Sequence, residues 1–176
     1  KSNISKKRFF QIVNKAKEYI KKGDIFQVVL SQRFETKLTK KPIEIYKKLR
    51  VTNPSPFMFF FNFSDFQIIG ASPEILVRLR NNIITVRPIA GTRPRGRNNK
   101  EDNLLKKDLI NDKKELSEHL MLLDLGRNDA GKVSKINTVK VTERFKIEKY
   151  SHVMHIVSNV TGVFDKKFSK FEALMA

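Results

Sequence analysis

The stretch FMFFFNFSDFQIIGASPEILVRLRNNIITVR, residues 57–87, decides the fold class. It consists of short apolar or alternating segments, the pattern of half-buried strands, which polar turn residues separate at 64–65, 72–73 and 81–82. This spacing predicts antiparallel hairpins. We expect strands over residues 57–63, 67–70, 75–80, 83–87, 139–149 and 152–163, and a β-like segment over residues 26–38.

Helical patterns surround these strands. Apolar residues recur at three- and four-residue steps before Gly23, and Pro42 stands at a favourable first helical position ahead of Asn53, which precedes a proline. A leucine face ahead of Gly126 predicts a further helix that this glycine ends. Strand clusters followed by helices indicate an α+β fold and not a parallel βαβ array. We expect helices over residues 5–22, 42–52, 104–110, 112–125 and 167–176, with polar turns over 93–103.

Length and composition limit the class of protein. With 176 residues, 40% apolar residues and no linker, the chain is expected to form one domain over residues 1–176. No long apolar run or leader stands out, so we expect a soluble cytoplasmic protein with no membrane partner. Cysteine is absent, which excludes disulfides and thiolate metal sites. Any metal would take oxygen or imidazole ligands, which favours a hard cation such as magnesium.

The net charge of +18 raises nucleic-acid binding as an alternative function. The lysines are scattered over helix faces and loops and form no basic tail, whereas a nucleic-acid footprint clusters on one face or in a recognised motif. We therefore expect a solvated basic surface and no nucleic-acid partner.

The segment PIAGTRPRG, residues 88–96, is a candidate binding loop. Gly91 and Gly96 are spaced as in a phosphate loop, but Arg97 and Asn98 follow where Lys and Ser or Thr are required. The backbone N–H groups around Gly91 and the hydroxyl of Thr92 could instead receive a carboxylate. The alternative is a basic turn without a ligand.

Two carboxylates on the helix expected over residues 112–125 form a candidate metal site. Glu115 and Glu118 lie three residues apart on one side of the helix, as a magnesium site that uses one or two carboxylates would need. The alternative is a solvated helix face beside Lys113 and Lys114.

Two further residues are candidates for proton transfer. His155 alternates with Val153 and Val157 along a strand and could act as a general base, or could be a half-buried histidine whose hydrogen bonds are satisfied. Glu74 follows Ser72 and a proline and could be an acid or could cap a turn.

Six blocks of the sequence resemble, in order, those of the chorismate-utilising enzymes. This resemblance implies antiparallel sheets packed face to face with helices outside, and it implies that residues 1–176 are the N-terminal and central portion of the chorismate-binding domain, truncated at both ends. The blocks are GDIFQVVLSQRF from Gly23, NPSPFMFF from Asn53, GASPE from Gly70, PIAGTRPRG from Pro88, KELSEHLMLLDLGRND from Lys114 and YSHVMH from Tyr150.

Two positions within the resemblance concern the nucleophile. Gln27 matches the position at which isochorismate and salicylate synthases carry a water-activating lysine, and Ala90 matches the lysine that attacks the ring in aminodeoxychorismate synthases. Ala90 has no nucleophilic atom. The resemblance therefore implies ammonia as the nucleophile and the anthranilate synthase branch of the family, with aminodeoxychorismate synthase as the close alternative.

The same resemblance implies roles for the candidate residues. Magnesium would bind Glu118, with Glu115 nearby, and would hold chorismate. Ala90, Gly91 and Thr92 would line the substrate, and Gln27 would complete the catalytic group. The resemblance further assigns the general acid to Glu74, the base to His155, and tryptophan inhibition to Pro56, Phe57 and Met58.

The resemblance also implies the pathway and the partners. Chorismate and ammonia would give anthranilate and pyruvate, the first step of tryptophan biosynthesis, through a lyase activity that this portion alone would lack. A glutamine amidotransferase subunit would supply the ammonia, because the chain has no cysteine nucleophile to release it.

Overall fold

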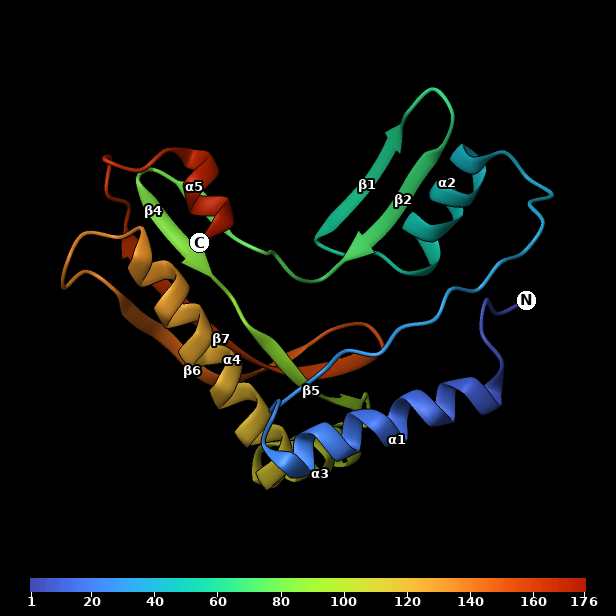
Figure 1. Cartoon of the computed structure of the whole chain (residues 1–176), viewed down its shortest axis with the longest axis horizontal. Coiled ribbons are helices and arrows are strands. Elements are labelled where there is room, and N and C mark those ends of the chain that lie inside the picture. The colour runs from blue at the N-terminus through green and yellow to red at the C-terminus, as the bar shows by residue number, and fades with distance from the viewer. The chain divides into compact units, whose positions relative to one another are not determined.

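A computed structural model describes all 176 residues, Lys1–Ala176 (Figure 1). The sequence predicted one domain, and the contacts divide the chain into two compact units, residues 1–45 and 46–176. Each unit has its own secondary structure.

The first unit contains helix α1, Lys6–Lys22. The Ser5 side chain caps its start by accepting a hydrogen bond from the N–H of Arg8. Gly23 ends it in the left-handed conformation, φ 79°, and donates its N–H to the carbonyl of Ile20. The helix expected over residues 5–22 is confirmed.

The β-like segment expected over residues 26–38 does not form a strand. It pairs through an isolated bridge between Phe34 and Ser2, beside which the N–H of Glu35 donates to the carbonyl of Lys1 at 2.7 Å. The prediction was wrong because an apolar alternation describes the two faces of a strand but does not supply the hydrogen-bonding partner along its edge.

A phenylalanine-rich hairpin follows helix α2, Pro42–Thr52. Strands β1, Phe57–Asn62, and β2, Gln67–Ser72, pair antiparallel over their whole length. The ring of Tyr46 on α2 lies 5.7 Å from that of Phe60 on β1. The helix and both strands confirm the sequence prediction.

The second sheet has five antiparallel strands with the longest at its centre. Strand β7, Val153–Val163, pairs with β6, Lys140–Lys149, along one edge. Along its other edge it pairs in succession with β4, Ile83–Val86, and β5, Ile89–Pro94. Strand β3, Arg78–Arg80, pairs with β4 and is shorter than expected. The central strand thus brings residues far apart in the sequence into one row.

Helices α3, Asn99–Asn111, and α4, Lys113–Lys132, pack on this sheet (Figure 1). Met154 and Ile156 on β7 form a buried cluster with Leu109 of α3. Because side chains alternate along a strand, the odd-numbered residues of β7 point to the opposite face. This leaves one face of the sheet for a site.

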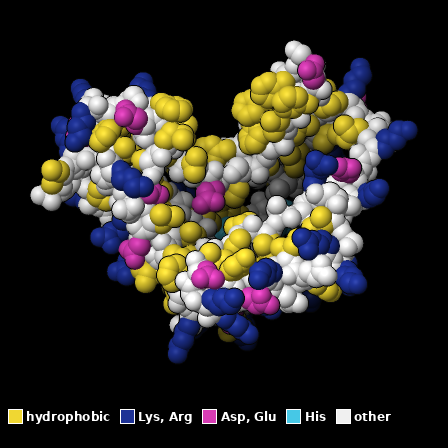
Figure 2. Space-filling view, in the orientation of Figure 1, with side chains coloured by type: hydrophobic (Ala, Val, Ile, Leu, Met, Phe, Trp, Pro, Cys, Tyr) yellow, Lys and Arg dark blue, Asp and Glu magenta, His cyan; other side chains and the backbone are white.

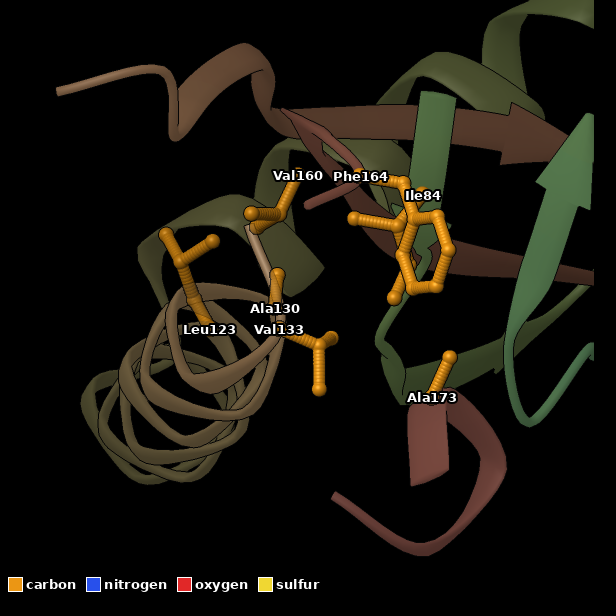
Figure 3. Close-up of a cluster of buried hydrophobic side chains, with 7 residues drawn as sticks. All are labelled: Ile84, Leu123, Ala130, Val133, Val160, Phe164 and Ala173. Carbon is orange, nitrogen blue, oxygen red and sulfur yellow. The ribbon is translucent and has the colours of Figure 1, made fainter. Parts of the chain in front are cut away.

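A second buried cluster joins α4, the sheet and helix α5, Lys170–Met175 (Figure 3). Antiparallel sheets with helices confirm the predicted α+β class. The hairpin and the five-stranded sheet share no strand pairing, and their face-to-face packing stays a prediction. The buried members of the cluster are Ile84, Leu123, Ala130, Val133, Val160, Phe164 and Ala173.

Both long helices extend beyond their predicted limits. Helix α3 begins at Asn99 and not at residue 104, because the Asn98 side chain accepts the N–H of Glu101 and caps the first turn. Helix α4 does not end at Gly126. This glycine lies where α4 approaches β4, and a Cβ atom there would stand 3.1 Å from Val86 Cγ1. A mid-helix glycine here serves close packing.

Asp102 closes the connection between β5 and α3. It is 2% exposed, and its carboxylate accepts hydrogen bonds from Arg95 Nη2 at 2.8 Å, the N–H of Gly96 at 2.6 Å and Lys149 Nζ at 3.0 Å. These donors, Arg95 first, hold the pKa of Asp102 well below its usual range. The network links three segments of the second unit.

Replacing Asp102 with Asn is expected to destabilise the full-length protein that contains this chain, more at pH 7 than in acid. Because its pKa is depressed in the folded state, the ionised carboxylate stabilises the fold above its ordinary pKa of 3.8, and the contribution is lost as the pH falls below that value. The gap between the denaturant midpoints of wild type and D102N should therefore be widest at neutral pH and should narrow only as the pH falls below 3.8 toward the lower folded-state pKa. A gap that stays constant with pH would contradict this role.

Candidate functional site

Strand β5 carries Gly91 and Thr92. The sequence predicted a loop here, and the structure forms a strand with a bulge at Gly91, φ 72°. Ala90 is opposite Ile156 and Thr92 is opposite His155, so Gly91 is the extra residue, and glycine adopts this left-handed conformation without strain. Consequently Ala90 shares a face with Ile156, whereas Thr92 shares the other face with His155.

Replacing Gly91 with Ala is expected to lower the free energy of unfolding by at least about 1–2 kcal/mol, the cost of a left-handed non-glycine residue. A Cβ atom would also stand 3.0 Å from Ile156 Cδ1 and 3.2 Å from Leu109 Cδ1. The matched control is Gly131→Ala in α4, where a Cβ atom meets nothing within 4 Å. Urea unfolding of the full-length variants measures both, and equal stability of the two variants would refute the bulge argument.

His155 lies half-buried on the face of the sheet opposite Met154 and Ile156. Its Nδ1 atom is 3.1 Å from the carbonyl oxygen of Gly91 and 3.0 Å from the Thr92 hydroxyl. A carbonyl oxygen only accepts, so this contact places the ring proton on Nδ1. The Nε2 atom then carries the lone pair that can take a proton. His155 is therefore held in the tautomer of a general base.

Glu74 lies in the connection between β2 and β3. The Ser72 hydroxyl bridges the backbone there, since it accepts the N–H of Glu74 at 3.2 Å and donates to its carbonyl at 3.0 Å. The turn is thus capped by Ser72, and the side chain of Glu74 is left for another role. Although the residue is exposed as a whole, loss of water around its carboxylate raises its pKa.

The Glu74 carboxylate lies close to the strands of the site. It accepts a hydrogen bond from the backbone of Ile89, the first residue of β5, and interacts with the charge of His155, and both effects partly offset the raised pKa. A carboxyl group that keeps its proton above the ordinary pKa is suited to be a general acid. The structure therefore places the predicted acid within range of the charge of the predicted base.

A cavity of about 440 Å³ opens beside Glu74. Its volume suits a small organic molecule. Glu74 and Arg87 line it with acidic and basic groups, and Gly126 and leucines of α4 line it from the helix. The full lining is Ser72, Glu74, Ile75, Leu76, Val86, Arg87, Pro88, Leu122, Leu125, Gly126 and Asp129.

Three residues near His155 were not predicted from the sequence. Arg87 forms an ion pair with Glu148, the hydroxyl of Tyr150 donates to Glu148 Oε2 at 3.1 Å, and the Tyr150 ring packs edge-on against His155 with centroids 5.5 Å apart. Only the pairing of β6 with β7 places Glu148 opposite His155. The block YSHVMH contained Tyr150, but no spacing argument assigned it a contact.

The two carboxylates of α4 lie one helical turn apart and are both half-buried. Glu115 Oε2 would lie 3.3 Å from a Cβ atom on Gly91, and Glu115 Oε1 is 3.8 Å from Arg93 Nη1. Arg93 also binds Asp112, the capping residue of α4. These ion pairs hold the start of α4 against β5, and the absent side chain of Gly91 makes room for Glu115.

The donor set fits part of a magnesium site. The chain has no group of three or more His, Cys, Asp or Glu residues arranged to hold a metal ion. Glu115 and Glu118 supply hard carboxylate oxygens, and magnesium sites commonly use one or two carboxylates with water and substrate oxygens as the remaining ligands. Buried His119 on the same helix contacts β7. Its Nε2 atom lies 2.7 Å from the Ser158 hydroxyl, and this hydrogen bond keeps α4 in place.

The geometry of the structure does not test the roles of the remaining predicted residues. Gln27 belongs to the first unit, is exposed and lies outside any strand. Phe57 and Met58 begin β1, opposite Ser72 and Ala71, and Pro56 precedes them. Their predicted roles stay predictions.

The expectation of a solvated basic surface stays a prediction. Lys and Arg side chains are scattered over the face seen in Figure 2 and form no single patch there. No helix is long and apolar enough to cross a membrane.

Glu74 lines a cavity of a size that suits a small molecule, which is the class of ligand that this site fits. Comparison with known families identifies the family. The profile described as chorismate binding enzyme matches residues 1–176, and the chain belongs to this family.

Relatives of this chain within the family carry the name anthranilate synthase component 1 or I. Anthranilate synthase component 1 of Cereibacter sphaeroides is 60% identical over all 176 residues, and that of Acetivibrio thermocellus is 55% identical over 175. The chain spans 35% of the length of each. The crystal structure of anthranilate synthase component I from Streptococcus pneumoniae superposes with a TM-score of 0.90 at 44% identity, over 98% of this chain and 38% of that one.

Proposed function

We propose that the full-length protein containing this chain converts chorismate and ammonia to anthranilate, pyruvate and water, as a lyase in tryptophan biosynthesis. The observations that carry this proposal are the raised pKa of Glu74, whose carboxylate lies within range of the charge of His155, and the contacts of Nδ1 that fix the tautomer of His155. The identity to anthranilate synthase component 1 supports it.

Glu74 acts first as the general acid. Loss of the ring hydroxyl of chorismate leaves water only if a proton is supplied, and a carboxyl group with a raised pKa holds that proton near neutral pH more often than an ordinary one. Ammonia adds to the ring as the hydroxyl leaves. The product of this step is an aminated ring, aminodeoxyisochorismate, that still carries the enolpyruvyl ether.

His155 acts second as the base. Its Nε2 lone pair removes the proton from the ring while the C–O bond of the ether breaks, and the ring becomes aromatic. The departing enolpyruvate takes up a proton, which the protonated imidazole can return, and becomes pyruvate. Gly91 and Thr92 hold Nδ1 during this transfer, because the proton on Nδ1 is bound between their oxygens at 3.1 and 3.0 Å. The backbone of Gly91 and the hydroxyl of Thr92 also bind a carboxylate of the substrate.

The carboxylates of α4 would hold the metal. Glu118, with Glu115, would hold magnesium, which supplies a positive charge that binds and polarises the substrate carboxylate when it is present. Arg93 on β5 forms an ion pair with Glu115 and holds it at the edge of this site.

Ammonia is the nucleophile because the chain offers no alternative at the two positions that decide it. Ala90 has no nucleophilic atom, and its side chain faces the helices with Ile156. Gln27 is not a base that activates water. A glutamine amidotransferase subunit supplies the ammonia, tryptophan binds at Pro56, Phe57 and Met58, and the protein acts in the cytoplasm.

Product analysis tests the proposal. Full-length protein incubated with chorismate and nitrogen-15 ammonium should give labelled anthranilate and pyruvate, identified by mass spectrometry. Labelled aminodeoxychorismate would support the alternative family branch, and unlabelled isochorismate would show that water attacks. Binding of DNA with a steep salt dependence and no chorismate conversion would support the nucleic-acid alternative. The 176-residue chain alone is expected to give no anthranilate.

A further inference from the structure

A row of side chains crosses three strands on the face that carries His155. Thr92 on β5 and Glu148 on β6 are both register partners of His155 on β7. Residues directly opposite one another in antiparallel strands point to the same face. Thr92 contacts His155 directly, and Glu148 binds Tyr150 and Arg87.

Tyr150 connects Glu148 to the imidazole. Its hydroxyl donates to Glu148 Oε2 at 3.1 Å, and its ring meets the His155 ring at an interplanar angle of 62°. Its backbone is fixed as well, since its N–H donates to Val153 at 2.8 Å and its carbonyl accepts Arg95 Nη1 at 2.8 Å. The phenol is therefore held at the ring, the hydroxyl and both backbone groups.

Glu148 is occupied on both oxygens. Oε1 pairs with Arg87 and Oε2 accepts the hydroxyl of Tyr150, and the Arg87 and Glu148 side chains are 27% and 23% exposed. Burial, and then the hydrogen bond to Glu148, raise the pKa of Tyr150, so its hydroxyl remains a donor.

We propose that Tyr150 is a positioning residue for His155, and that Glu148 and Arg87 hold it in place. Its ring packs at a steep angle against the imidazole and restricts rotation, so that Nδ1 stays on the carbonyl of Gly91 and Nε2 faces the substrate. This inference rests on the proposed function, in which Nε2 removes the ring proton. Arg87 connects this group of side chains to the cavity, which it lines together with Glu74.

The test combines kinetics with a spectroscopic readout in the full-length protein. Tyr150→Leu removes the ring, and Tyr150→Phe removes only the hydroxyl. Glu148→Gln removes the charge of the carboxylate that accepts the hydrogen bond from this hydroxyl. Tyr19→Phe is the matched control, because it removes the hydroxyl of an exposed tyrosine on α1. Nitrogen-15 labelled histidine reports the tautomer of His155 from the chemical shifts of its two ring nitrogens, assigned with a His155→Ala variant.

We expect wild type and Y19F to show a single tautomer with the proton on Nδ1. In Y150L the two nitrogen shifts should approach each other as both tautomers become populated, and kcat should fall about 10- to 100-fold because the base is misplaced. KM should change by less than about twofold, since the substrate contacts remain. Y150F and E148Q should show smaller changes in the same direction, and they keep the test valid if Y150L does not fold.

Unchanged histidine shifts and an unchanged kcat in Y150F and E148Q would overturn the inference, whatever reaction the protein catalyses. If the shifts change as expected but wild type forms no anthranilate, the positioning role stands and the proposed function fails. If KM rises while kcat and the shifts are unchanged, Tyr150 binds substrate and does not position His155. These outcomes separate the two proposals.

Discussion

Replacing Glu74 with Gln is expected to reduce kcat for anthranilate formation by about 10²- to 10⁴-fold, the range associated with loss of a general acid. Gln has nearly the same size and keeps an oxygen that can accept the backbone hydrogen bond from Ile89. It cannot donate a proton to the departing hydroxyl. The loss should therefore fall on kcat, with little change in KM.

The pH dependence of kcat provides the control for this prediction. An acid works in its protonated form, so the wild-type rate should fall as the pH rises through the pKa of Glu74. Burial raises that pKa above its ordinary value of 4.5, which moves this fall toward neutral pH. The residual rate of E74Q should lack this alkaline fall. A fall that persists unchanged in E74Q would assign the titration to another group.

Replacing His155 with Ala is expected to stop the reaction after ammonia has added. Anthranilate formation should drop by about 10²- to 10⁴-fold, while chorismate is still consumed and an aminated ring that keeps its enolpyruvyl group accumulates. The accumulating compound, measured by rapid quench and mass spectrometry, identifies the step that needs the base. The matched control is His152→Ala, which replaces an exposed histidine in the turn just before β7.

Loss of chorismate consumption in H155A would contradict the division of roles. Structural damage alone would lower both steps, and the stability of H155A in urea distinguishes this case. The variant removes the contacts of Nδ1 with Gly91 and Thr92 but leaves the pairing of β5 with β7, which depends on the backbone.

Local sequence patterns were sufficient to predict those helices and strands whose limits depend only on residues nearby in the chain. The hairpin of β1 and β2, the helices α1 and α2, and the long pair β6 and β7 follow from alternation, helical spacing and turn residues. Asn81 and Asn82, with φ 52° and 59°, form a turn between β3 and β4 where the sequence predicted one. The core positions of these elements follow from the same periodicity.

Elements that depend on distant partners were not predictable in the same way. The segment of β5 has the prolines, arginines and glycines of a turn, and only its pairing with β7 makes it a strand. Gly126 resembles a helix end, but the approach of α4 to Val86 explains it. The missed start of α3 is different, because Asn98 followed three residues later by Glu101 is a recognisable capping pattern.

The candidate site shows the same division. Glu74, His155, Gly91 and Thr92 were named from the sequence, but their meeting depends on the bulge in β5 and on tertiary contacts with the connection after β2. The contact of Tyr150 with His155 depends on the turn that closes β6 onto β7, and two register shifts between these strands prevent its prediction by counting.

In the proposed mechanism, Glu74 is necessary only for the first step and His155 only for the second. The most direct measurement is to isolate the aminated compound that accumulates with H155A and to give it to the full-length E74Q variant. We predict that E74Q, which barely converts chorismate, will convert this compound to anthranilate and pyruvate at nearly the wild-type rate. Failure of E74Q to convert it, while wild type does, would contradict the assignment of the two residues to successive steps.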